Sequence, residues 1–246
     1  MHVTLHDHGL DTVMNHLRVV MWLLTMMALL VVAGYSLATP LPPNAIPLLP
    51  VLKKEILQHW PGLNPRSTLG ALVEQESCVS LKSKRCWSPR AELKTDREYG
   101  FGLGQITITK RFNVWEETKR MDPSLRDWQW DDRYRADYQL RGIVIKNRNT
   151  YAQMSKLTPR RIDRLSFTFS AYNGGAGGLI KDRTLCSKTK GCDPTRWSGH
   201  VELTSFKSRT VVKGYGKSFY AINREYVKNI MSLLPRRQKY VAALDS

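Results

Sequence analysis

The chain has 246 residues, of which 42% are hydrophobic, and it carries a formal net charge of +17. This length and hydrophobic content allow a domain with its own core and exclude a disordered chain. The positive charge favours an anionic polymer as partner, such as nucleic acid, anionic lipid or a cell-wall polymer. Because the sequence contains no RRM, zinc-finger or P-loop pattern, we do not expect nucleic acid to be that partner.

The first 38 residues divide into a polar tail and an apolar segment. Residues 1–18 contain four histidines and one basic residue, Arg18, and we interpret them as a solvated tail. Residues 19–38 carry no charge and are about as long as a bilayer-spanning helix. The same segment fits a signal peptide, with residues 36–38 as the cleavage site. We favour an uncleaved anchor in the inner membrane over a removed signal peptide, and either one places the rest of the chain in the periplasm.

A proline-rich stretch separates this segment from the expected domain. Residues 39–50 contain five prolines and predict a stiff, extended linker. Residues 51–60 predict a short amphipathic helix that ends at Pro61. We expect one folded domain over residues 51–235, and we expect the basic segment 236–246 to be a frayed tail.

The stretch 64–77 predicts a helix that starts at Asn64 and Pro65, as N-cap and first helical residue. Its apolar positions at i, i+3 and i+4 are Leu69, Leu72 and Val73. The i+7 member of this stripe is Glu76. A carboxyl group on an apolar face resists ionisation, which suits a general acid, and a structural ion pair is the alternative. We expect Glu74 to point to the opposite side as an ordinary exposed acid.

The four cysteines form two close pairs, Cys78 with Cys86 and Cys186 with Cys192. There is no CxxC motif and no histidine cluster beside them, so we do not expect a zinc site. Two short-loop disulfides in an oxidising compartment fit an exported chain, and four buried free thiols are the alternative. The first pair opens a basic, loop-like insertion over residues 78–98.

Residues 99–107, YGFGLGQIT, contain glycines at three alternating positions. Such a run lets the backbone approach another group closely. A phosphate-binding loop is disfavoured, because no Lys-Ser or Lys-Thr pair follows to open a helix.

The remaining chain predicts further helices and no strand ladder. Residues 131–155 predict a helix with many arginines on a solvated face. Thr158 and Pro159 predict the start of another, which Asn173-Gly174-Gly175 would end. Its apolar stripe is Ile162, Leu165, Phe169 and Tyr172. We expect residues 176–198 to be a loop. The stripe of the last helix is Val227, Ile230, Met231 and Leu234, closed by Pro235.

Four separated motifs then occur in a recognisable order. They are Glu76-Ser77, GLGQ ending at Gln105, AYNGG over residues 171–175, and REYVKNI over residues 224–230. In this order they resemble the SLT-type lytic transglycosylases, relatives of goose-type lysozyme, over about residues 55–234. The resemblance implies a mainly α, lysozyme-like domain with long loops, preceded here by the N-terminal membrane or signal helix.

Three features depart from the family pattern, and the first is the long insertion between Glu76 and Gln105, which carries cysteines. The family has a Ser-x-x-Gly-Ala-x-Gly run before the glutamine, whereas Thr95 and Asp96 stand near the serine position here and Tyr99 replaces the first glycine. The family serine is therefore not assigned to any residue. The family acid that precedes the closing Tyr-Val helix also has no counterpart, because residues 216–218 stand there.

The resemblance implies cleavage of the β-1,4 bond between N-acetylmuramic acid and N-acetylglucosamine, with a 1,6-anhydro product. Glu76 would be the one catalytic carboxyl group, acting first as acid and then as base. Neither cofactor nor metal is required, and the expected partner is a peptidoglycan glycan strand bound by a monomer. The alternatives are lysozyme-type hydrolysis, a non-catalytic wall-binding or assembly protein, and a membrane-anchored nucleic-acid binder. The compact layout and the disulfides fit a phage or mobile-element protein.

The resemblance also assigns roles around Glu76. Gln105 would hydrogen-bond an N-acetyl or hydroxyl group, Tyr172 would orient Glu76, and Asn173 would contact backbone or sugar. Ser77 and Tyr226 complete the expected substrate-binding set. The alternatives are core aromatics for Tyr172 and Tyr226 and a helix C-cap for Asn173. Asp96, Glu98 and Glu74 are candidates for a hydrolytic base, although surface charges are the more ordinary interpretation. Trp87 and Trp115 could stack on sugars, although buried tryptophan is commoner.

Overall fold

The computed structural model describes residues 40–246 except residues 97, 208 and 215. The expected tail over residues 1–18 and the apolar segment 19–38 lie outside the described residues. Within residues 40–246, apart from those three positions, no helix is long and apolar enough to cross a membrane.

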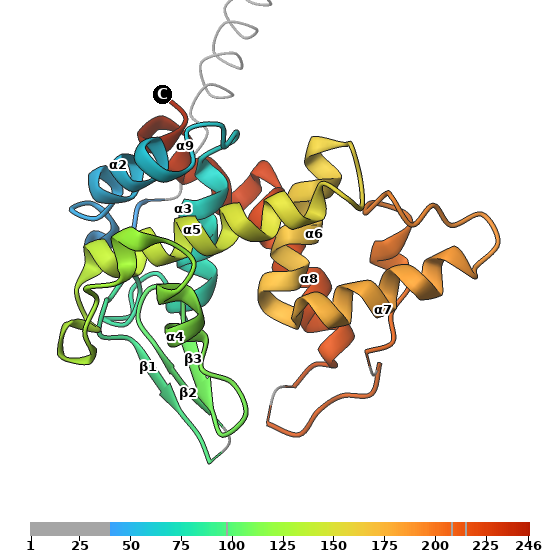
Figure 1. Cartoon of the computed structure of the whole chain (residues 1–246), viewed down its shortest axis with the longest axis horizontal. Coiled ribbons are helices and arrows are strands. Elements are labelled where there is room, and N and C mark those ends of the chain that lie inside the picture. The colour runs from blue at the N-terminus through green and yellow to red at the C-terminus, as the bar shows by residue number, and fades with distance from the viewer. Residues whose placement is uncertain (1–39, 97, 208, 215) are drawn as a thin grey trace, which may run out of the picture. The chain divides into compact units, whose positions relative to one another are not determined.

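The described domain is mainly helical, as expected (Figure 1). Its α-helices are α2 (Leu49–His59), α3 (Ser67–Ser77), α4 (Val114–Lys119), α5 (Ala136–Met154), α6 (Arg161–Gly174), α7 (Ala176–Ser187), α8 (Phe219–Met231) and α9 (Gln238–Leu244). Its strands are β1 (Glu92–Lys94), β2 (Glu98–Phe101) and β3 (Ile106–Thr109). Short helical turns η1 (Pro43–Ala45), η2 (Pro123–Leu125), η3 (Trp130–Asp132), η4 (Val201–Leu203) and η5 (Leu233–Arg237) lie between them.

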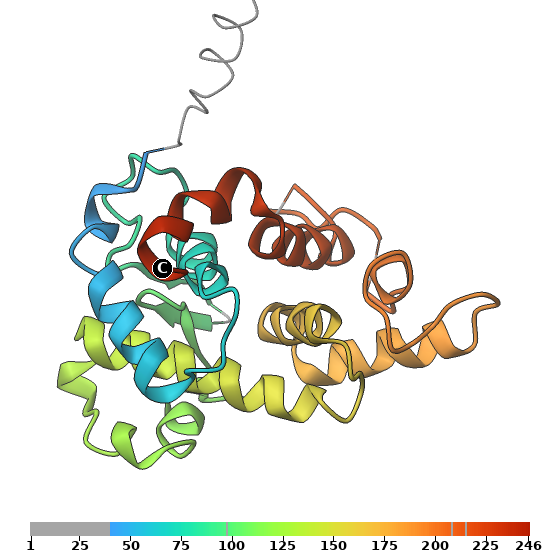
Figure 2. The same ribbon diagram turned by 90° about the horizontal axis from the view of Figure 1, so that it is seen from above.

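Helix α3 lies inside the helical assembly. It packs against α8 and α9, while α6 packs against α5, α7 and α8 (Figures 1 and 2). The main core contains the fully buried Leu69 and Leu72 of α3 together with Phe167 and Phe169 of α6. Burying apolar side chains on several sides of α3 fixes the helix that carries Glu76.

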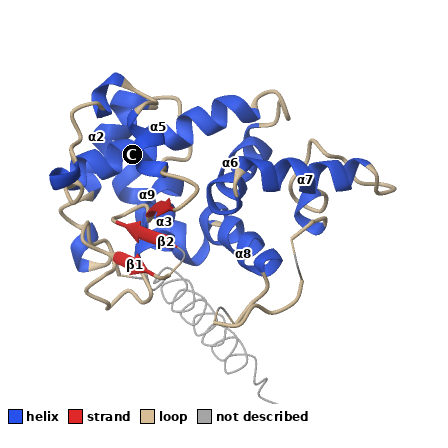
Figure 3. Ribbon diagram, turned by 60° about the horizontal axis from the view of Figure 1, so that its bottom comes forward, coloured by secondary structure: helices blue, strands red, loops and turns tan. Residues whose placement is uncertain are grey.

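The three strands, labelled in Figure 1 and drawn as red arrows in Figure 3, form one antiparallel sheet in the order β1-β2-β3. Glu92 of β1 pairs with Phe101 of β2, which pairs in turn with Ile106 of β3. Phe101 and Ile106 belong to a second core cluster with the buried Trp115 and Trp128. Our expectation that the chain has no strand ladder is therefore wrong, because strands of three or four residues are too short to show an alternating pattern.

The extended linker expected over residues 39–50 is also wrong for the described residues 40–50. This stretch contains η1 and the start of α2, and the side chains of Ala45 and Leu49 are buried. Prolines stand in the first turns of both helices, where a missing N–H costs nothing. The stretch belongs to the same compact unit as the rest of the described chain.

Two segments that we expected to be irregular are helical. Helix α7 occupies the first half of the expected loop 176–198. Helix α9 occupies the expected frayed tail 236–246, and its Tyr240 and Leu244 are fully buried. Tertiary packing stabilises both elements, and a short helix gives little local signal for it.

The expected helix starts are shifted along the chain. Helix α3 begins at Ser67, and the Ser67 amide donates to Asp245 Oδ1 at 2.7 Å rather than to a side chain at position 64. Helix α6 begins at Arg161, two residues after Pro159. Helix α5 confirms the helix expected over residues 131–155, although its arginines are not simply solvated. Arg141 pairs with Glu55, and Arg148 pairs with Asp122.

Both disulfides are confirmed. Cys78 is bonded to Cys86, and Cys186 is bonded to Cys192. The first bond closes a short loop directly after α3, so the end of this helix is covalently tied to the segment that carries Trp87.

Candidate active site

Glu76 lies in the last turn of α3, half-buried beside the fully buried Leu72 and Val73. Its Oε1 accepts a hydrogen bond of 2.5 Å from the hydroxyl of Tyr226 on α8. Burial raises the pKa of Glu76 to about 7, and the Tyr226 hydrogen bond and the positive charge of Lys146 oppose that rise. A carboxyl group with this pKa can donate and accept a proton near neutral pH.

Glu74 differs from its expected role as an exposed surface acid. Its side chain is buried, and it forms ion pairs with Arg236 at 3.0 Å and Lys239 at 2.9 Å. The hydroxyl of Tyr240 donates to its Oε2 at 2.5 Å. The expectation is wrong because η5 and α9 cover the face of α3 that the local periodicity leaves open. Glu74 is consequently a structural anion and is unavailable as a hydrolytic base.

The two tyrosines have different roles from those that the resemblance implies. Tyr226 rather than Tyr172 contacts Glu76, while the Tyr172 hydroxyl donates to the carbonyl of Gly104 at 2.8 Å. The two rings are nearly parallel, with centroids 6.5 Å apart. Burial and the nearby Glu76 raise the pKa of both hydroxyls, so both stay protonated donors near neutral pH.

The glycine-rich run approaches this site closely. A Cβ added to Gly104 would lie 2.8 Å from the Tyr172 hydroxyl and 2.7 Å from the side chain of Ile143. A glycine is therefore needed where the loop crosses α5 and α6, as the glycine spacing predicts. Tyr172 ties this loop to the same pair of rings that contacts Glu76.

Gln105 follows Gly104 directly and is half-buried. Its Nε2 donates to the carbonyls of Gly102 at 2.9 Å and Ala91 at 3.3 Å. The amide nitrogen therefore stabilises the loop, and the Oε1 is the end that remains to accept a hydrogen bond from a ligand.

Ser77 is a structural residue, so we no longer assign substrate binding to it. It is buried, and its hydroxyl donates to the Val73 carbonyl at 2.7 Å and accepts from the Trp87 amide at 3.0 Å. Trp87 is fully buried, and its Nε1 donates to the Tyr240 hydroxyl. Trp115 is also buried, in the second core cluster. Sugar stacking by either tryptophan is thus wrong, and both belong to the core.

Asn173 connects the end of α6 to α8. Its exposed side chain accepts a hydrogen bond of 2.9 Å from Asn223, which also donates to the Ser170 carbonyl and accepts from the Ser170 hydroxyl. Asn173 therefore makes a contact between helices rather than a helix cap, and α6 continues to Gly174.

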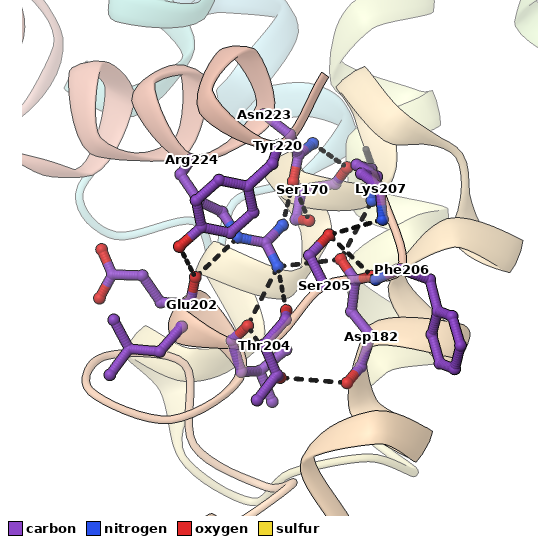
Figure 4. A network of polar contacts seen from close by, with 12 residues as sticks. Ser170, Asp182, Glu202, Thr204, Ser205, Phe206, Lys207, Tyr220, Asn223 and Arg224 are labelled. Carbon is purple, nitrogen blue, oxygen red and sulfur yellow. Dashed lines mark hydrogen bonds and ion pairs between the residues drawn. The ribbon is translucent and has the colours of Figure 1, made fainter. Parts of the chain in front are cut away.

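A polar network extends from Asn223 to α7 (Figure 4). Arg224 donates to Asn223 Oδ1 at 2.6 Å and to Asp182 Oδ2 at 2.9 Å, and Lys207 donates to the same Asp182 oxygen. Burial alone would raise the pKa of Asp182, but the Phe206 amide, Arg224 and Lys207 together hold it below its ordinary value. This network fixes the loop after α7 to the α6–α8 pair.

Lys146 of α5 is a site residue that sequence analysis missed. Its ammonium lies 4.4 Å from the centroid of the Tyr172 ring. The sequence does contain a signal for this residue. Lys146 follows the apolar residues Ile143 and Ile145 of a predicted helix, as Glu76 follows the apolar residues of its helix. We instead assigned the charges of this helix to its solvated face.

Cavity size does not locate this site. A cavity of about 960 Å³ is lined by residues between Pro40 and Leu48 and between Leu81 and Pro89, and Glu76 is not among them. We rank Glu76 first because a titrating carboxyl group can do chemistry that an apolar hollow cannot. Within the described part of the chain, no three histidine, cysteine or acidic side chains are grouped so that they could hold a metal ion.

No protein-family model matches the sequence, and no curated protein matches it either.

Proposed function

We propose that the chain is a peptidoglycan lytic transglycosylase with a lysozyme-like domain. The observation that carries this proposal is Glu76, a half-buried carboxyl group with a pKa of about 7 at the end of a buried helix. Tyr226 holds its Oε1, and the Gly-Leu-Gly-Gln loop lies on the neighbouring Tyr172. These residues come from all four motifs on which the family resemblance rests, and they lie close together in the fold.

One carboxyl group is sufficient for the proposed reaction. Glu76 donates its proton to the glycosidic oxygen as the bond from that oxygen to C1 of the muramyl sugar breaks. The resulting carboxylate then takes the proton of the muramyl 6-hydroxyl, whose oxygen forms a new bond to C1. The products are an N-acetylglucosamine end and a 1,6-anhydromuramyl end, and Glu76 regains its proton.

The other acids named as hydrolytic bases fit this role less well. Glu74 is ion-paired in the interior, and Asp96 is exposed near the hairpin between β1 and β2. Glu98 lies on β2 in the same hairpin. An intramolecular nucleophile on the substrate removes the need for an enzyme base that activates water.

The proposal includes the setting of the enzyme. We propose an exported monomer that is tethered to the inner membrane through residues 19–38, or released into the periplasm if that segment is removed. The two disulfides fit an oxidising compartment. The net charge of +17 favours wall polymers that carry carboxylated peptide stems.

Product analysis tests the proposal. The full-length chain is incubated with purified peptidoglycan, and the soluble products are analysed by mass spectrometry. We expect 1,6-anhydromuramyl ends, and we expect Glu76→Gln to reduce their formation by at least about a thousandfold. The matched control Glu225→Gln removes an exposed carboxylate on α8 and should keep full activity.

The other outcomes assign other functions. Reducing muramyl ends in place of anhydro ends would assign lysozyme-type hydrolysis. Binding to peptidoglycan without soluble product would assign a wall-binding protein, and steeply salt-dependent DNA binding without wall activity would assign a nucleic-acid binder. Full activity of Glu76→Gln would refute the mechanism.

A further inference from the structure

The ammonium group of Lys146 is placed unusually for a lysine. The side chain is half-buried on α5, and its Nζ lies 4.4 Å from the centroid of the Tyr172 ring. Among the described residues, this ammonium forms neither an ion pair nor a hydrogen bond. A lysine normally extends its flexible stem to place the charge in water. Here the charge is instead held over an aromatic ring of the candidate site.

A series of contacts connects this charge to Glu76. The Tyr172 ring under Lys146 is stacked on Tyr226 at 6.5 Å, and the Tyr226 hydroxyl contacts Glu76 Oε1 at 2.5 Å. The four side chains come from four helices, α5, α6, α8 and α3. One cation and one carboxyl group thus contact the same pair of stacked tyrosines.

We propose that Lys146 is a positioning residue whose positive charge sets how readily Glu76 changes between carboxylic acid and carboxylate. Burial favours the neutral acid at Glu76, and an unpaired cation nearby favours the carboxylate. The effect is mutual. Burial lowers the pKa of Lys146, and the negative charges of Glu76 and of Glu117 on α4 oppose that decrease.

The other charged groups around Glu76 leave this role to Lys146. On the α9 side of α3, Lys239 is paired with Glu74. Arg236 of η5 is also paired with Glu74, and its charge only partly opposes the rise in the pKa of Tyr226. Tyr172 and Tyr226 stay neutral, because burial and Glu76 raise the pKa of each. Lys146 is the cation that lowers the pKa of Glu76 itself.

The consequence for catalysis rests on the proposed function. When Glu76 gives its proton to the glycosidic oxygen, a carboxylate forms near an ammonium that is already in place. The attraction between the two charges favours this proton transfer and keeps Glu76 ionised until it takes the proton of the 6-hydroxyl. The pKa of about 7 is then a balance of burial, which raises it, against the Tyr226 hydrogen bond and the charge of Lys146, which both lower it. This balance sets the working pH.

Direct titration of Glu76 tests the proposal without using activity. The full-length chain is labelled with 13C at glutamate Cδ, and the Glu76 signal is assigned by its loss in Glu76→Gln. We expect Lys146→Met to move the titration midpoint of Glu76 upward by about half a pH unit to one unit. Lys146→Arg keeps the charge and should restore a midpoint near that of the unaltered protein. The alkaline limb of the activity profile should move in the same direction as the midpoint.

Lys119→Met is the matched control. Lys119 also lies over an aromatic ring, at 4.5 Å from Trp115, and it lies 3.7 Å from Glu116. Its charge is not among those that shift the pKa of Glu76, so its replacement should leave the midpoint of Glu76 unchanged. An unchanged midpoint in folded Lys146→Met would overturn the proposal.

A reciprocal measurement covers the case in which Lys146→Met does not fold. Because the coupling of two charges is symmetrical, Glu76→Gln should lower the titration midpoint of Lys146, read from 13C at lysine Cε. No change there would also overturn the proposal. If the midpoints move as expected but peptidoglycan yields no anhydro product, the proposed function fails and the coupling of Lys146 to Glu76 stands.

Discussion

Glu74 and Glu76 lie two residues apart on α3, and their surroundings give them opposite roles. Glu74 is in contact with two cations and a tyrosine hydroxyl, so its charge is compensated. Glu76 has one hydroxyl contact and a more distant cation, and its pKa rises to about 7. At the scale of the residue, the presence or absence of direct ion pairs distinguishes a structural acid from a titrating one.

The raised pKa of Glu76 has a consequence for stability. Between about pH 4.5, where the unfolded chain loses this proton, and pH 7, the folded chain holds the proton more tightly. The contribution of the Glu76 carboxyl group to the free energy of unfolding is therefore fully present at low pH, and it is lost as the pH rises through 7. We expect the free energy of unfolding of Glu76→Gln, relative to that of the unaltered protein, to increase by about 2 kcal/mol as the pH is raised from 5 to 8. Urea unfolding at the two pH values measures this difference. The exposed-acid variant Glu225→Gln should gain nothing, and a Glu76→Gln difference that is constant with pH would contradict the raised pKa.

Local patterns could predict Glu76 but not its partners. The helical period places Glu76 among apolar residues, and this information lies within one turn of chain. The expectation for Glu74 is wrong because its partners, Arg236 of η5 and Lys239 of α9, are more than 160 positions away along the chain. The roles of Tyr172 and Tyr226 depend on the rotation of α6 relative to α8, which no local period fixes.

At the scale of the element, α9 holds the helix that carries Glu76 in place. Tyr240 is fully buried against α3, where a Cβ added to Gly70 would lie 2.7 Å from its ring. The same tyrosine contacts Glu74 and accepts a hydrogen bond from Trp87. A short segment with weak helix signals thus completes the core around α3, and this is why its stability could not be judged from its own residues.

Removing the charge of Glu74 should therefore release α9. Glu74→Gln leaves Lys239 and Arg236 without their counter-charge in a buried place. We expect a loss of about 3 kcal/mol in the free energy of unfolding, measured in urea. The control Glu116→Gln breaks an ion pair of which the acid is 40% exposed, and it should cost less than about 0.5 kcal/mol. Equal effects of the two substitutions would show that the Glu74 contacts do not stabilise α9.

At the scale of the whole molecule, two polar clusters connect elements that are far apart in the sequence. The Glu74 cluster joins α3 to η5 and α9, and the Asp182 cluster joins α7 to α8 and to the loop before it (Figure 4). The mainly helical architecture follows from apolar periodicities in the sequence. The Glu74 and Asp182 clusters need partners from distant segments of the chain, so they can be identified only in the folded structure.

Because of the Asp182 cluster, we expect the stability of the protein to decrease at low pH. The pKa of Asp182 is held below its ordinary value, so its contribution is present above about pH 4 and is lost as the pH falls through the lowered pKa. Asp182→Asn leaves Arg224 and Lys207 unpaired, and we expect it to cost about 3 kcal/mol at pH 7 and less at pH 3, measured by urea unfolding. Thr184→Ala, on the exposed side of the same helix, is the control and should show no such dependence. A cost for Asp182→Asn that is the same at both pH values would contradict this account.

The contact between Tyr240 and Glu74 spans 166 positions of the chain, and this separation delays assembly during synthesis. At a synthesis rate of roughly 5–20 residues per second, α9 is synthesised about ten to thirty seconds after α3. Until then Glu74 has no counter-charge, and the helix that carries Glu76 lacks one wall of its core. A nascent chain therefore cannot present a finished acid site, so a wall-degrading activity would arise only after the whole domain has been produced.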